Sequence, residues 1–267
     1  MLRKGDLTQG GITGTLLHFT LPMLVGSFLQ QCYNIADTLI VGQCIGAGAL
    51  AAVGSAYTLM VFLISVLLGL AMGSGTVFSL HYGAGNHVAL RRSIFSSFAL
   101  IGIVTLILNV VVFIWLDPIL RLLQVPQDIY GMMRSYLWII FCGIVFTFIY
   151  NFYASLLRAV GDSVTPLWFL AVSVVLNIAL DLFFILQLDW GIQGAAAATV
   201  LAQGVAALGI IIYTYRRRPE LRWHHEDMCF DRTCLKEIAS FSTLTCVQQS
   251  VMNLGILMVQ GLVNSFG

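Results

Sequence analysis

Long apolar stretches separated by short polar breaks run through the whole chain. A helix needs about 20 apolar residues to cross the hydrocarbon core of a bilayer. Seven stretches reach that length, and they cover residues 16–45, 50–80, 93–116, 132–157, 165–188, 192–215 and 238–263. Gly, Pro and charged residues mark the connectors between them. The pattern therefore predicts an all-α polytopic membrane protein with seven spans.

Composition supports the same class of protein. Of the 267 residues, 59% are hydrophobic and 9% are charged, whereas about 25% are charged in an ordinary soluble domain. The net charge of +1 provides no basic field for a nucleic-acid partner. The expected surroundings of this chain are therefore the lipid bilayer.

Positive charges predict the orientation of the spans. If the N-terminus lies in the cytoplasm, every Lys and Arg except Arg121 and Arg134 falls on the cytoplasmic side. Positively charged loops are retained on that side of the membrane. We therefore expect a multi-pass protein of the cell membrane with a cytoplasmic N-terminus.

A faint internal repeat suggests how the chain is divided. Gln30-Gln31 in the first span and Gln248-Gln249 in the seventh occur at similar depth. Their separation of roughly 220 residues equals six spans and a linker, as expected of a repeated six-helix unit. The predicted division is a six-helix lobe over residues 1–215, a solvated cytoplasmic linker over 216–236, and the first helix of a truncated second lobe over 237–267.

Two acidic residues lie inside the predicted spans, Asp37 in the first and Asp181 in the fifth. An ionisable side chain at this depth is costly and usually serves a function. Counting about 1.5 Å per residue from the outer ends places Asp37, Asp181 and Thr199 at one level, roughly 10–13 Å deep. Asn177 precedes Asp181 by one helical turn and shares its face.

These four side chains offer oxygen ligands, which suit a hard cation such as Na⁺. Burial favours the neutral form of a carboxylate and a nearby cation favours the charged form, so the cluster can also exchange a proton. We interpret Asp37, Asn177, Asp181 and Thr199 as a site for Na⁺ or H⁺ that needs no other cofactor. The alternative is that these groups only join helices by hydrogen bonds, and charge makes that alternative costly for the two acids.

Other polar residues extend this pattern. Gln30 and Asn34 widen the polar face of the first span, and Gln203 lies one turn beyond Thr199. Pro22 removes a backbone hydrogen bond from the first span and predicts a helix bend there. No span or loop combines a nucleophile with a base, a metal triad or a phosphate-binding motif, so we do not expect an enzyme.

Three motifs resemble the multidrug and toxic compound extrusion (MATE) family, in its prokaryotic DinF-like branch. The first is Pro22 followed by Asp-Thr-Leu-Ile-Val-Gly at 37–42, Gly46, and Ala-Ala-Val-Gly at 51–54. The second is Leu-Arg-Ala-Val-Gly-Asp-Ser at 157–163, ahead of Pro166. The third is the group of Asn177, Asp181 and Thr199. By this resemblance, the whole chain corresponds to the family's N-terminal lobe and the first helix of its C-terminal lobe.

The resemblance implies a twelve-helix antiporter in which two six-helix lobes surround a central cavity. Such a protein exchanges Na⁺ or H⁺ for organic solutes, often cationic and amphiphilic. It implies that Asp37, Asn177, Asp181 and Thr199 form the cation or proton site of the first lobe. Tyr136 would hydrogen-bond into this site, although an interfacial anchor is the other reading of that residue.

The resemblance also implies that the second lobe, a partner in cis, is missing after the seventh helix. The alternative function is a flippase of the same superfamily for lipid-linked oligosaccharides or polysaccharides. Such proteins tend to carry cationic residues in the central cavity, and the predicted spans have none at mid-depth.

Overall fold

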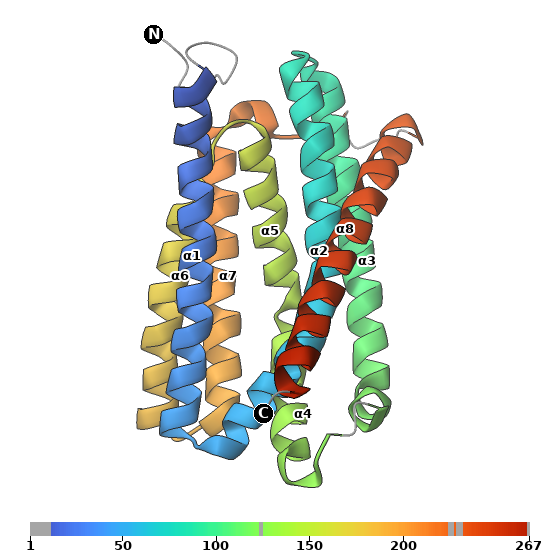
Figure 1. Cartoon of the computed structure of the whole chain (residues 1–267). Coiled ribbons are helices and arrows are strands. Elements are labelled where there is room, and N and C mark those ends of the chain that lie inside the picture. The colour runs from blue at the N-terminus through green and yellow to red at the C-terminus, as the bar shows by residue number, and fades with distance from the viewer. Residues whose placement is uncertain (1–11, 123–124, 224–226, 228–231, 266–267) are drawn as a thin grey trace.

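The computed structural model describes residues 12–122, 125–223, 227 and 232–265, and every element in these ranges is helical. The helices lie side by side in an elongated bundle (Figure 1). They are α1 (Ile12–Cys44), α2 (Ala47–Gly83), α3 (His87–Leu122), α4 (Gln127–Cys142), α5 (Ile144–Ala159), α6 (Val164–Leu182) with a π-helical turn η1 (Phe183–Gln187), α7 (Gly191–Arg217), a 3₁₀ turn η2 (Pro219–Leu221) and α8 (Arg232–Ser265). The predicted all-α fold is confirmed.

Seven helical elements correspond to the seven predicted spans, but they differ in how apolar they are. By length and composition, α2, α3, α6 with η1, and α7 can each cross a membrane, and α4 with α5 makes a fifth candidate. The 33-residue α1 and the 34-residue α8 are not among these candidates in the described part of the chain. Both carry a polar Gln-Gln pair, at 30–31 and at 248–249. Both nevertheless run alongside the other helices (Figure 1).

The predicted span 132–157 is not one straight helix. It is broken at Gly143, and α4 and α5 meet there at an angle of 48°. A Cβ atom at Gly143 would lie only 2.5 Å from Cγ2 of Val200 on α7, so only glycine fits at this position. The break therefore lets α4 and α5 both pack closely on α7.

The first helix lies beside the fifth and sixth predicted spans, a relationship that the sequence leaves open. α1 packs mainly on α6 and also contacts α2 and α7. α6 and α7 are antiparallel neighbours joined by a tight turn, in which Asp189 and Gly191 both adopt a φ of 53°. α1 continues as one helix through Pro22, and the bend at Pro22 stays a prediction.

Positive charges gather at one end of the bundle. The α2–α3 turn, the α5–α6 turn and the C-terminus of α7 lie at this end, which we call the basic end (upper end in Figure 1). It carries Arg91, Arg92, Arg158, Arg216, Arg217 and Arg218, whereas Arg121 and Arg134 lie on α3 and α4 at the opposite end. The charge asymmetry expected from the sequence is therefore present, and its assignment to the cytoplasm stays a prediction.

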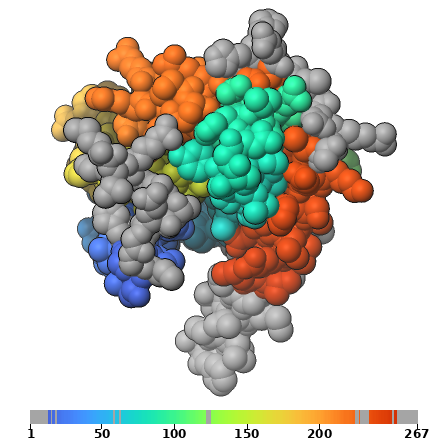
Figure 2. All heavy atoms as spheres, turned by 90° about the horizontal axis from the view of Figure 1, so that it is seen from above, coloured from blue at the N-terminus to red at the C-terminus, as the bar shows by residue number. Residues whose placement is uncertain are grey.

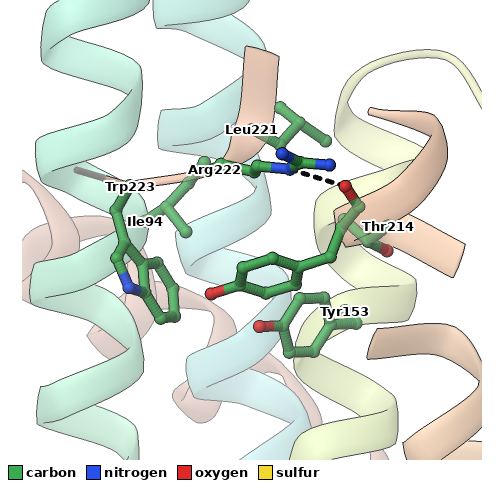
Figure 3. A pocket seen from close by; sticks show the side chains of 7 residues that line it. Ile94, Tyr153, Thr214, Leu221, Arg222 and Trp223 are labelled. Carbon is green, nitrogen blue, oxygen red and sulfur yellow. Dashed lines mark hydrogen bonds between the residues drawn. The ribbon is translucent and has the colours of Figure 1, made fainter. Parts of the chain in front are cut away.

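Residues 218–223 fold back onto the basic end instead of extending into solvent (Figure 3). Leu221 is only 3% exposed. The ring of Trp223 packs against Phe98, with 5.5 Å between centroids, and Arg222 Nε donates a hydrogen bond of 2.6 Å to the carbonyl of Tyr215. The expectation of a solvated linker is therefore wrong for this part of 216–236. Apolar and aromatic side chains within a polar stretch explain the difference.

Candidate cation site

Three helices bring the two membrane acids together. Asp37 on α1 is 8% exposed, Asp181 on α6 is fully buried, and their carboxyl groups lie within hydrogen-bonding reach of each other. Asn177 on α6 and Thr199 on α7 are buried next to them. The structure thus brings the four residues together in one cluster. Their role as an ion site stays a prediction.

The Asn177 amide connects the acid of α6 to the hydroxyl of α7. In one orientation its nitrogen donates to Asp181 Oδ2 at 2.9 Å, and its oxygen accepts from the Thr199 N–H at 3.2 Å and from the Thr199 hydroxyl at 3.3 Å. The opposite orientation would place the amide oxygen against the carboxylate and the amide nitrogen against the N–H group. The first orientation satisfies both the nitrogen and the oxygen of the amide, so Asn177 holds α6 and α7 in register at the acids.

The acids themselves are incompletely bonded. Asp37 Oδ1 and Asp181 Oδ1 are both buried, and neither has a hydrogen-bond partner in the described structure. A buried carboxylate oxygen without a partner is costly. Two facing carboxylates also repel each other unless a proton or a cation lies between them. The free carboxylate oxygens of the two acids suit a hard cation such as Na⁺ or a shared proton.

Tyr33 is a fifth member of the cluster, and sequence reasoning missed it. It lies one helical turn before Asp37 on α1, and its hydroxyl shares a hydrogen bond of 3.2 Å with Thr199 Oγ1. The spacing of four residues from Asp37 was the available signal, because residues i and i+4 lie on one helix face. This bond is the direct polar link between α1 and α7.

The predicted supporting residues divide into two groups. Tyr136 on α4 is 4% exposed and lies close enough to Asp37 and Asp181 to interact electrostatically with both. Its predicted hydrogen bond into the site stays a prediction. Gln203 is held instead by α5, because its side-chain oxygen accepts a hydrogen bond from the Thr147 hydroxyl.

The polar residues in the middle of α1 lie outside the cluster. Asn34 donates to the side-chain oxygen of Gln31 at 3.2 Å, and Gln30 is exposed. Phe28, which is 72% exposed, lies on the same stretch of helix. The exposed part of α1 that precedes Asp37 therefore carries both polar and apolar side chains.

The family of the chain follows from a match over most of the predicted lobe. The MatE family model matches residues 22–183, which contain Asp37, Asn177 and Asp181. The chain belongs to the MATE family. Its assignment to the DinF-like branch stays a prediction.

Two curated relatives are named as drug-resistance proteins. The probable multidrug resistance protein YpnP of Bacillus subtilis is 32% identical over 273 aligned residues, which cover 100% of this chain and 59% of the relative. The multidrug export protein MepA of Staphylococcus saprophyticus is 31% identical over 210 residues, which cover 76% of this chain and 45% of the relative. The matched part of this MATE chain therefore corresponds to 59% of the length of the first relative and 45% of that of the second.

Solved MATE structures share the fold. A structure described as the outward-facing conformation of a multidrug resistance MATE family transporter superposes with a TM-score of 0.89 at 24% identity, covering 96% of this chain and 57% of that one. A crystal structure of MATE in complex with MaD3S gives a TM-score of 0.91 at 23% identity, covering 100% and 60%. At this identity the likeness establishes the helical fold alone.

Proposed function

We propose that this MATE chain forms the ion-coupling lobe of a secondary active exporter of organic compounds. The observation that carries the proposal is the pair of buried carboxyl groups, Asp37 on α1 and Asp181 on α6, each with an unpartnered oxygen. A group of this kind inside a membrane is costly unless it binds something. The relatives are named multidrug resistance and multidrug export proteins, which supports export as the purpose of the binding.

Coupling follows from the positions of the two acids on different helices. A proton or Na⁺ between Asp37 and Asp181 removes their repulsion and favours the packing of α1 on α6. Release of the ion leaves two facing charges and favours another arrangement of α1. An ion can shift the equilibrium only by the difference in its affinity for the two arrangements.

The transported compounds are organic solutes, cationic and amphiphilic ones in particular. On the exposed part of α1, the Gln31 amide and the apolar Phe28 are three residues apart and share one helix face. Such a surface binds apolar rings together with a polar group. The acids beside it favour a positive charge on the solute. In the two-lobe form, this face would line one wall of the cavity between the lobes.

The proposal places the protein in the cell membrane with the basic end in the cytoplasm, as a transporter and not an enzyme. A lipid-linked oligosaccharide flippase remains the second candidate. It is less well supported, because the described spans carry no Lys or Arg near their mid-length that would bind an anionic lipid phosphate.

The test is ²²Na⁺ binding by the purified two-lobe protein at several pH values, with solute binding measured in parallel. Sodium coupling predicts saturable ²²Na⁺ binding that weakens as the pH falls, because protons compete for the same carboxylates. Proton coupling predicts pH-dependent solute binding without ²²Na⁺ binding. Asp181→Asn abolishes the response in either case. A response that survives in both Asp37→Asn and Asp181→Asn would overturn the proposal.

A further inference from the structure

Helix α8 packs along α2 through a face made of very small residues. Gly69 and Gly73 lie one turn apart on α2 and face α8. A Cβ atom at Gly73 would lie 2.4 Å from Cα of Ser242, and one at Gly69 would lie 2.9 Å from Cα of Cys246. Real Cβ atoms do not approach other atoms this closely, so the contact requires glycine at both positions.

The partner residues on α8 are small and are also spaced by one turn. Ser242 Oγ donates to the backbone carbonyl of Leu70 at 3.3 Å, and Cys246 Sγ donates to that of Val66 at 3.6 Å. Both helices thus present the small-xxx-small pattern that lets membrane helices approach backbone to backbone. Figure 2, which looks onto the basic end, shows α8 lying directly against the α2–α3 hairpin.

Towards the basic end the same contact becomes apolar and then ends in a pair of polar side chains. Val77 packs with Cys234 and Ile238, and His81 Nε2 lies 3.6 Å from Oε2 of the exposed Glu237. We call this surface the α2–α8 seam, formed by residues 66–81 of α2 and 234–246 of α8.

The seam differs from the opposite face of α2. There, the buried Ser155 hydroxyl of α5 donates to the Ala71 carbonyl at 2.8 Å, and the fully buried Phe78 and Phe152 pack edge to face at 5.9 Å. The seam has longer hydrogen bonds, and its contact between His81 and the exposed Glu237 contributes little to stability. The face of α2 against α5 is therefore tightly packed, whereas the face against α8 can separate at a smaller cost in free energy.

We propose that the α2–α8 seam is a contact that the transport cycle closes and opens, and that Gly69 and Gly73 determine how favourable its closed form is. The inference rests on the proposed function, because it takes α8 as the first helix of the second lobe and requires the two lobes to move. Helices that meet at backbone distance leave few interlocking side chains to disengage. A methyl group on either glycine would hold the helices apart and favour the open form.

Cys246 is a natural reporter of this contact, since its thiol lies against Gly69 inside the seam. The experiment uses the two-lobe protein, in which every cysteine of this chain except Cys246 is replaced by alanine. The measurement is the rate at which N-ethylmaleimide labels Cys246. Gly73→Ala is the test variant. Gly83→Ala on the same helix is the matched control, because a Cβ at Gly83 would meet nothing within 4 Å.

Gly73→Ala is expected to raise the labelling rate by about tenfold, and Gly83→Ala to leave it unchanged. Addition of Na⁺ at constant pH should alter the rate in the parent protein, and a change of pH should alter it by more than in a reference variant that keeps only the exposed Cys44, where the pH acts through the thiolate fraction alone. Equal labelling rates in Gly73→Ala and Gly83→Ala would overturn the proposal. A labelling rate of the parent protein that responds to neither Na⁺ nor pH, while ²²Na⁺ or solute binding is intact, would overturn it too. If the parent protein binds no coupling ion while Gly73→Ala still raises the labelling rate as expected, the result would instead count against the proposed function. If Gly73→Ala does not fold, Ser242→Val removes the hydrogen bond to Leu70 and enlarges the same contact.

Discussion

Tyr33 of α1 and Thr199 of α7 share a hydrogen bond of 3.2 Å across 166 positions of sequence. Thr199 also contacts the Asn177 amide of α6, so its hydroxyl lies where three helices meet. A change at either end of the Tyr33–Thr199 bond should therefore alter the fit of the whole cluster around a bound ion, and not only the packing of α1.

Tyr33→Phe tests this relationship directly, because it removes one hydroxyl and keeps the ring. A hydrogen bond of this kind contributes about 1 kcal/mol, so the affinity for the coupling ion should fall about fivefold. The measurement is an isotherm of ²²Na⁺ or pH-dependent solute binding by the purified two-lobe protein. Tyr57→Phe is the control, since Tyr57 lies on α2 and is 50% exposed. An affinity for the ion equal to that of the parent would show that the bond only joins helices.

In the two-lobe protein, Asp37→Asn and Asp181→Asn should each abolish ion-driven efflux of a cationic dye from cells, while the protein still inserts in the membrane. Each change keeps the shape of the side chain and removes the charge that the ion must balance. Asp117→Asn is the matched control, because Asp117 near the end of α3 lies outside the cluster, in an exposed ion pair with Arg134 at 2.8 Å. Efflux that is equally reduced in all three variants would point to a general effect on folding.

Much of the site could be predicted from the sequence, because the relevant geometry is local and regular. The constant rise of an α-helix placed Asp37, Asp181 and Thr199 at one level by counting alone, and the structure brings them together. Asn177 followed from its spacing of one turn from Asp181. The same spacing rule applies to Tyr33, but an uncharged tyrosine inside a membrane costs much less than an acid, so its position alone does not indicate a site.

The features that could not be predicted depend on contacts between distant segments. Nothing in the apolar run 132–157 shows that Gly143 ends one helix and begins another, because the reason lies at Val200 on α7. The position of α1 against α6 likewise depends on packing that no periodicity encodes. Trp223 was assigned to a solvated linker because its neighbours in sequence are polar, whereas its neighbours in space are the rings of α3 and α7.

Gly143→Ala should destabilise the lobe, because the new methyl group would overlap the Val200 side chain at 2.5 Å. Overpacking of this kind costs about 1–3 kcal/mol. The measurement is the Tm of the purified protein in detergent. Adding Val200→Ala to the variant should restore much of the loss by making room, and Gly131→Ala on α4 should have little effect, since a Cβ there meets nothing within 4 Å. A double variant that is no more stable than Gly143→Ala would contradict the steric explanation.

Trp223→Ala should loosen the docked segment at the basic end. The Trp223 ring contacts Phe95, Phe98 and Tyr215, with centroids between 5.5 and 6.3 Å away. Truncating a buried tryptophan to alanine costs about 3–5 kcal/mol, and the loss here should be smaller because Trp223 is only partly buried. Trp168→Ala is the control, because Trp168 is 68% exposed on the outer face of α6. We expect a lower Tm and faster proteolysis between α7 and α8 in Trp223→Ala alone. Equal behaviour of the two variants would mean that the aromatic contacts do not hold the segment on the bundle.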